Sequence, residues 1–78
     1  DVNKAIKIDP EFYDAYFARG FLKYIIDDNG GAVADYTLAI KKGYKAPLVY
    51  KRRGEAKESM GNTKGAKKDF EKYEELKR

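Results

Sequence analysis

Residues 16–36 read YFARGFLKYIIDDNGGAVADY, and residues 50–70 read YKRRGEAKESMGNTKGAKKDF. Aligned without a gap, the two stretches carry the same or a closely similar residue at Tyr16 and Tyr50, Arg19 and Arg53, Gly20 and Gly54, Lys23 and Lys57, Gly31 and Gly65, Ala32 and Ala66, Asp35 and Asp69, and Tyr36 and Phe70. The same register places residues 5–7 on residues 39–41, which both read AIK. This constant offset of 34 residues indicates that the chain is built from repeated structural units.

The spacing of apolar residues within these units is typical of helices, and no strand pattern occurs. Five helices are expected, over about residues 2–8, 11–27, 32–42, 47–60 and 64–76. The residue types at the boundaries are those that start or stop helices: Asp9-Pro10-Glu11 opens the second, Asn29-Gly30-Gly31 breaks it, and Gly43 ends the third. Pro47 opens the fourth helix, and Gly61-Asn62 turns the chain before the fifth.

The composition excludes several classes of function. The 78 residues include no cysteine and no histidine, so disulfides, thiolate metal sites and the commonest general base and zinc ligand are all missing. Ser59 is the only serine, and Asp27–Gly31 lacks the alternating ligand spacing of a calcium loop. No apolar run approaches the roughly 20 residues of a membrane span. We therefore expect a protein that is not an enzyme, with no cofactor, no metal and no membrane partner.

Helix pairs that recur with a period of about 34 residues resemble the tetratricopeptide repeat family. The resemblance treats residues 1–78 as one segment, with the end of a partial repeat at 1–10, a first full repeat at 13–46 and a second at 47–78, whose last helix acts as a cap. It implies an all-α, right-handed helical-repeat solenoid of antiparallel helix pairs. The residues that carry it are expected to form the core: Tyr16, Gly20, Ala32, Tyr36, Tyr50, Gly54, Ala66 and Phe70.

The chain departs from the family pattern mainly by its charged residues. Arg19 and Arg53 stand where the family usually has leucine, and Lys23 and Lys57 stand where it usually has tyrosine. Arginine and lysine can lay their apolar stems along a helix crossing and keep their charges in water. We therefore expect these four side chains to be tolerated with solvated charges.

One side of the first helix in each repeat carries the candidate binding residues. In the family this side lines a groove that binds peptides or partner helices, so the resemblance implies a non-catalytic scaffold for protein–protein interaction. The positions in this chain are Phe17, Phe21, Tyr24, Ile25, Lys51, Arg52 and Glu55. The aromatic half of this stripe has a second interpretation, in which it packs against residues 2–8 or against a helix that would precede them.

Three further hypotheses concern partners. The net charge of +4 lies in residues 47–78, which hold ten basic and six acidic residues, so a basic helical module that binds an anionic partner such as nucleic acid is the alternative function. The interleaved acids argue against nucleic acid and favour a protein or peptide ligand. Ala5, Ile6 and Ile8 expose a face that another repeat should cover, which predicts self-association or membership of a longer array.

Overall fold

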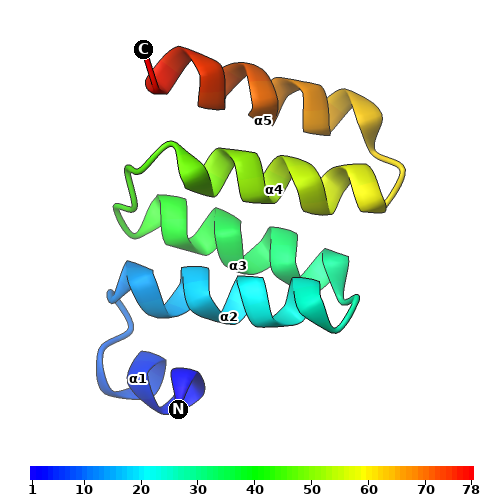
Figure 1. Cartoon of the computed structure of the whole chain (residues 1–78). Helices are drawn as coiled ribbons and strands as arrows, with labels where there is room; N and C mark the ends of the chain where they lie inside the picture. Colours follow the sequence, from blue (N-terminus) through cyan, green and yellow to red (C-terminus); the bar gives the residue numbers. More distant parts are fainter.

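The structure, a computed structural model, describes residues 1–78 and contains five α-helices and no strand. The helices are α1 (Val2–Ile8), α2 (Tyr13–Ile25), α3 (Asn29–Lys41), α4 (Leu48–Ser59) and α5 (Thr63–Leu76). From α2 to α5, consecutive helices run in opposite directions and pack side by side, so α2 with α3 and α4 with α5 form two hairpins (Figure 1). The fold class is all-α, and none of the five helices is long and apolar enough to cross a membrane.

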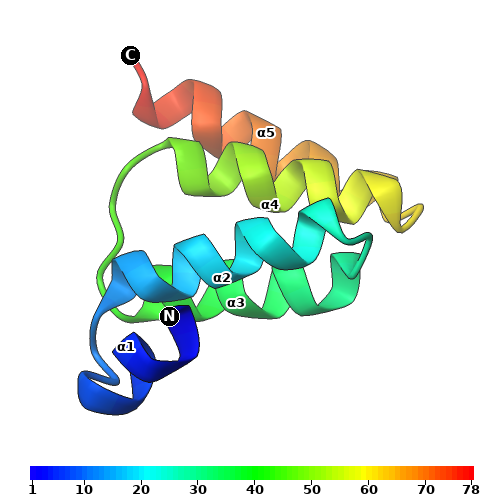
Figure 2. The same ribbon diagram turned by 60° about the horizontal axis from the view of Figure 1, so that its bottom comes forward.

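Helices α2 and α4 share one side of the molecule. They are in contact with each other although α3 lies between them in the chain. Figure 2 shows both toward the viewer, with α3 and α5 behind them. Residues on these two helices can therefore form one continuous surface.

The five predicted helices are present, and several of their boundaries are confirmed. Pro47 directly precedes α4 as its N-cap. Gly43 follows α3 with a φ of +108°, a backbone conformation that favours glycine. The Tyr44 N–H donates to the Ala39 carbonyl at 2.9 Å, which closes the end of α3. Pro47 and Gly43 therefore mark the start of α4 and the end of α3 through their own backbone preferences, as the sequence predicted.

Two predicted boundaries are wrong. Helix α2 begins at Tyr13, not at residue 11, because Asp9 ends α1 and its carboxylate accepts from the Glu11 N–H at 3.1 Å. Asn29-Gly30-Gly31 is the first turn of α3, not a break. The chain reverses earlier, at Asp27 with a φ of 68°, and the Asp28 carboxylate then caps α3 by accepting from the Gly31 N–H at 3.0 Å.

The core lies where the two hairpins meet, around the ring of Tyr36. Of the eight residues predicted as core, six are buried, and the other two, Tyr50 and Phe70, are half-buried. Tyr36 and Ala32 are fully buried, together with Ala39, Val49 and Ala56. The close approach of α2 to α3 depends on Gly20, because a Cβ there would lie only 2.9 Å from the Tyr36 ring.

Gly20→Ala is expected to lower the free energy of unfolding by about 1–2 kcal/mol, because the fully buried Tyr36 ring has no room to move away from the added methyl group. The matched control is Gly54→Ala, whose Cβ would meet the Phe70 ring at 2.7 Å. The gain of about 1 kcal/mol in helix propensity is the same in both variants. Phe70 is only half-buried and can shift outward, although the buried Asp69 Cβ would lie 3.2 Å from the new methyl group, so Gly54→Ala should cost less than Gly20→Ala. Urea denaturation measures both variants, and equal losses would contradict this difference.

Candidate functional site

The candidate binding residues lie on the shared side of α2 and α4. Phe17, Phe21, Tyr24 and Ile25 belong to α2, and Lys51, Arg52 and Glu55 belong to α4. The structure brings Phe21, Arg52 and Glu55 together. Tyr24 is partly buried and packs against the core, and the other three residues have different neighbours.

Phe21, Arg52 and Glu55 form a mixed apolar and charged cluster between the two helices. The Arg52 guanidinium carbon lies 5.8 Å from the centroid of the Phe21 ring, within the range of a cation–π contact. The Arg52 Nη1 also donates to Glu55 Oε1 at 3.0 Å. The Phe21 side chain remains 39% exposed. This Phe21–Arg52–Glu55 cluster therefore presents an accessible aromatic ring beside a donor and an acceptor whose charges cancel.

Phe17 is a packing residue more than a surface residue. Its ring stacks on Tyr44 at a centroid distance of 4.9 Å and lies 5.4 Å from the ring of Tyr36. Tyr13 meets Tyr44 edge-on at 5.3 Å, and burial raises the pKa of Tyr44 above its ordinary value. The aromatic stripe thus packs at its N-terminal end against the α3–α4 connection.

The hydroxyl of Tyr36 is buried and has no hydrogen-bond partner within the protein. Burial raises the pKa of Tyr36 to about 12, while the charges of Arg52 and Glu55 act on it in opposite directions. The phenol is therefore neutral at physiological pH. Two members of the Phe21–Arg52–Glu55 cluster, Arg52 and Glu55, therefore influence the pKa of a phenol in the centre of the core.

Ile25 and Lys51 have other neighbours. Ile25, 61% exposed, lines a hollow of about 590 Å³ between α1 and the end of α2, together with Val2, Leu22 and Ile26. The Lys51 Nζ lies 5.5 Å from the ring centroid of Tyr73 on α5. Ile25 was predicted from helical spacing and Lys51 as an equivalent position one repeat later, and neither signal shows how far a side chain is turned from the common face.

The residues predicted for self-association are unequally exposed. Ala5 and Ile6 are partly buried, and Ile6 packs against the core, whereas Ile8 is 75% exposed. The face available to another copy is consequently smaller than the sequence implied.

A buried ion-pair network joins α2 to α3. The Arg19 guanidinium makes two hydrogen bonds of 2.8 Å to the carboxylate of Asp35, whose side chain is 2% exposed. The Lys23 Nζ lies 3.1 Å from the same carboxylate. The hydrogen bond to Asp35 raises the pKa of Arg19. Burial alone would raise the pKa of Asp35, but hydrogen bonds and charges from Arg19 and Lys23 outweigh it and lower that pKa.

The same network recurs one repeat later, between α4 and α5. Arg53 donates to both carboxylate oxygens of Asp69 at 2.9 and 2.7 Å, and the Lys57 Nζ lies 3.1 Å from Asp69. The four side chains stay partly exposed, as expected, but their charges also pair with buried carboxylates, which the sequence did not predict. Bidentate pairing with a buried carboxylate holds them at the helix crossing. An arginine, a lysine and an aspartate recur together at equivalent positions of the two repeats. This recurrence is the signal in the sequence that could have identified both networks.

Each arginine also reaches the preceding helix. Arg19 Nη1 donates to the side-chain oxygen of Asn3 on α1 at 3.0 Å, and Arg53 Nη1 donates to Thr37 Oγ1 on α3 at 3.2 Å. Asn3 and Thr37 are themselves equivalent positions in the register of the repeat. One guanidinium thus binds its own hairpin through two donors and the preceding helix through a third.

A comparison of the chain with protein-family models, with curated proteins and with solved structures found no match. Only the residues and their geometry therefore bear on what the protein does.

Proposed function

We propose that the chain is a non-catalytic protein-interaction module of the tetratricopeptide type, which binds a peptide or a partner helix along the shared side of α2 and α4. The observation that carries this proposal is the Phe21–Arg52–Glu55 cluster, an accessible aromatic ring and a charge-balanced pair contributed by two helices that are not consecutive in the chain. Aromatic residues, phenylalanine among them, and arginine are enriched at protein interfaces relative to the rest of the surface.

The repeat interpretation is supported by contacts that recur at the period seen in the sequence. The arginine–aspartate–lysine network and its contact to the preceding helix occur once in residues 13–46 and once in residues 47–78. Equivalent side chains therefore make equivalent contacts. We assign one tetratricopeptide-like unit to each of these two ranges on that ground, with α1 as the end of a preceding unit.

The chemistry of the cluster suits a peptide. Arg52 uses one of its donors for Glu55 and keeps others for a backbone carbonyl or carboxylate of a ligand. Glu55 Oε2 is available to a backbone N–H, and the Phe21 ring offers an apolar contact. A peptide supplies a carbonyl, an N–H and an apolar side chain within a few ångströms, so all three groups can be used at once.

The ligand is a peptide selected from a random displayed library for binding to the natural chain. Phe21→Ala is expected to weaken its binding by about tenfold or more. The free energy of unfolding should fall by less than about 1 kcal/mol, because the ring is 39% exposed in the free protein. Leu22→Ala is the matched control, since Leu22 is exposed but lines the hollow beside α1. Titration calorimetry and urea denaturation measure the two effects. A large loss of stability with no specific loss of binding would contradict the proposal.

The anionic-partner alternative receives less support from the contacts. Five of the ten basic residues in 47–78 are paired with carboxylates: Arg52, Arg53, Lys57, Lys72 and Lys77. The carboxylates beside these cations reduce the net positive charge that this region presents to a phosphate backbone. Binding of random-sequence DNA or RNA, titrated with salt, separates the two functions, because only the anionic-partner function predicts a steep loss of affinity with salt.

A further inference from the structure

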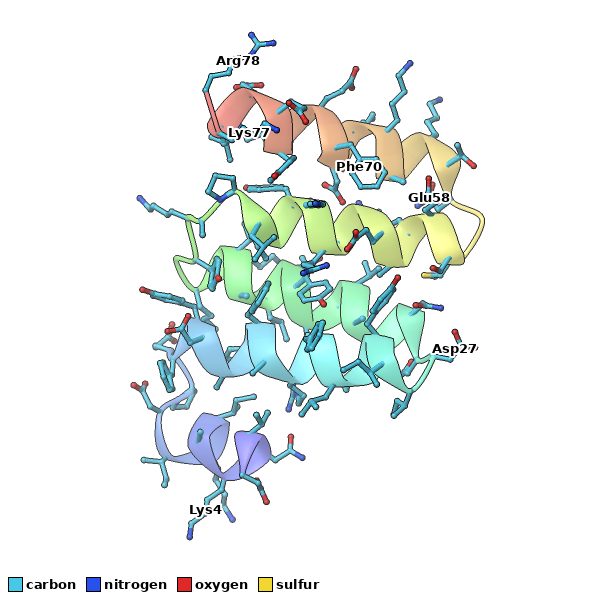
Figure 3. All side chains as sticks on the ribbon, viewed as in Figure 1. Lys4, Asp27, Glu58, Phe70, Lys77 and Arg78 are labelled. Atoms are coloured by element: carbon cyan, nitrogen blue, oxygen red, sulfur yellow. The ribbon has the colours of Figure 1, made fainter.

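Tyr36 and Phe70 occupy equivalent positions one period apart, but only Tyr36 carries a hydroxyl. Each ring packs against a glycine of the preceding helix: a Cβ on Gly20 would lie 2.9 Å from the Tyr36 ring, and a Cβ on Gly54 would lie 2.7 Å from the Phe70 ring. Figure 3 shows the labelled Phe70 side chain between α5 and α4, where it borders an open hollow of about 640 Å³ on the outer face of α5. Because phenylalanine serves at this position in the second hairpin, packing against the glycine does not require the hydroxyl of Tyr36.

The Tyr36 hydroxyl is a hydrogen-bond donor that the folded chain leaves unpaired. Tyr36 is fully buried, and its hydroxyl has no partner within the protein. The titratable groups that act on this hydroxyl are two members of the Phe21–Arg52–Glu55 cluster and the phenol of Tyr24. The hydroxyl therefore lies toward the shared side of α2 and α4. Buried polar groups are normally paired, and an unpaired one lowers stability, so this group calls for a role other than packing.

Glu55 is the acceptor that could pair with this hydroxyl, and in the free protein Arg52 occupies it. The Arg52 Nη1 donates to Glu55 Oε1 at 3.0 Å. The side chains of Arg52 and Glu55 are 35% and 28% exposed, so both can change position without disturbing the core. A ligand carbonyl or carboxylate that binds the guanidinium competes with Glu55 for it. A hydroxyl that donates to a free carboxylate forms a short, strong hydrogen bond.

We propose that Tyr36 is a positioning residue of the binding side: when a ligand carbonyl or carboxylate draws Arg52 away from Glu55, the released carboxylate accepts a hydrogen bond from the Tyr36 hydroxyl. This inference rests on the proposed function, because it concerns the same site. Binding then pairs a buried donor that the free protein leaves unpaired, and this gain adds to the affinity. The gain is specific, since a ligand that only covers the Phe21 ring leaves Arg52 on Glu55 and does not obtain it.

The first test needs no ligand, because removal of the guanidinium releases Glu55 in the same way. Arg52→Leu keeps an apolar side chain beside Phe21 but donates no hydrogen bond. In the natural chain, Tyr36→Phe should leave the midpoint of thermal unfolding unchanged or raise it by about 4 °C. In the Arg52→Leu chain, the same substitution should lower the midpoint by about 4 °C or more, because the hydroxyl there has an acceptor. Adding Glu55→Ala to Arg52→Leu should abolish this fall.

Tyr16→Phe is the matched control. The Tyr16 hydroxyl is also in the core, but it donates to the Pro10 carbonyl at 2.8 Å. Its removal should therefore lower the midpoint of thermal unfolding by a similar amount in the natural chain and in the Arg52→Leu chain. Circular dichroism during heating measures all of these midpoints.

The second test uses the peptide selected on the natural chain from the displayed library, with titration calorimetry as the measurement. Tyr36→Phe should weaken its binding by about fivefold or more although the free protein is no less stable, and Arg52→Leu should weaken it at least as much. Tyr16→Phe should leave the affinity unchanged although it destabilises the fold. A purely structural role for Tyr36 would not produce this opposition between stability and affinity.

The outcomes separate this inference from the proposed function. An equal fall of the midpoint when Tyr36→Phe is made in the natural and Arg52→Leu chains would overturn the inference, as would no fall in the Arg52→Leu chain. Unchanged affinity of Tyr36→Phe for a peptide that Phe21→Ala weakens would also overturn it. A peptide that Phe21→Ala does not weaken would instead contradict the proposed function, while the midpoints still decide whether the Tyr36 hydroxyl pairs with a released Glu55.

Discussion

Asp35→Asn is expected to lower the free energy of unfolding by about 2–3 kcal/mol. The carboxylate is almost fully buried, accepts two hydrogen bonds from Arg19 and forms an ion pair with Lys23, so a neutral amide leaves two cations without their partner. Removing one member of a buried ion pair costs about 3–5 kcal/mol. The expected value lies at or below the lower end of that range because Arg19 and Lys23 are partly exposed and can be rehydrated. Urea denaturation at pH 7 measures the loss.

The depressed pKa of Asp35 adds a pH signature to the same variant. A carboxylate with a lowered pKa in the folded state stabilises the protein above its unfolded pKa of about 4, and this contribution is lost as the pH falls through the lower folded value. The natural chain should therefore lose more stability below about pH 4 than the Asp35→Asn variant does. Asp14→Asn, on an exposed residue, is the control and should follow the natural chain. If the free energies of unfolding of the natural chain and of Asp35→Asn fell in parallel as the pH is lowered, the assigned ion pair would be contradicted.

Tyr36→Ala is expected to be the most destabilising single truncation, at about 3–5 kcal/mol. The ring is fully buried, packs against Phe17 at 5.4 Å and fills the space left by Gly20. A domain of this size has a total stability of only about 5 kcal/mol or a little more, so thermal unfolding should shift downward by about 15 °C or more. Circular dichroism during heating measures this shift.

Phe70→Ala provides the comparison at the equivalent position of the second hairpin. Because Phe70 is half-buried and borders the hollow on α5, its truncation should cost less than half as much as that of Tyr36. If Tyr36→Ala leaves the chain too unfolded to analyse, Tyr36→Leu and Phe70→Leu preserve the comparison with smaller losses. Equal costs at the two positions would contradict the different burial described for them.

The helical fold follows from the sequence because its signals are local. Apolar spacing predicts all five helices, and Gly43 and Pro47 mark boundaries through their own backbone preferences. The start of α3 was missed because Asn29-Gly30-Gly31 resembles a turn, and only the capping bond from Gly31 to Asp28 makes it helical. Capping geometry outweighed the low helix propensity of glycine.

The side-chain networks are harder to predict because they depend on distances between helices. Arg19 and Asp35 are 16 residues apart, and helical spacing alone cannot show that they meet. For the candidate site, the sequence identified Phe21, Arg52 and Glu55, which the structure brings together, but also Ile25 and Lys51, which contact other groups. A difference of one residue turns a side chain by about 100° around a helix, so small differences in position decide which residues share a face.

An amide NMR titration tests most directly whether the side shared by α2 and α4 binds a peptide. The ligand is a peptide selected from a displayed library on the natural chain alone. We expect saturable shift changes concentrated on Phe21, Arg52, Glu55 and their neighbours on α2 and α4, and none in the Phe21→Ala variant. Shifts confined to α1 or to the outer face of α5, or equal shifts in the two proteins, would contradict the proposed function.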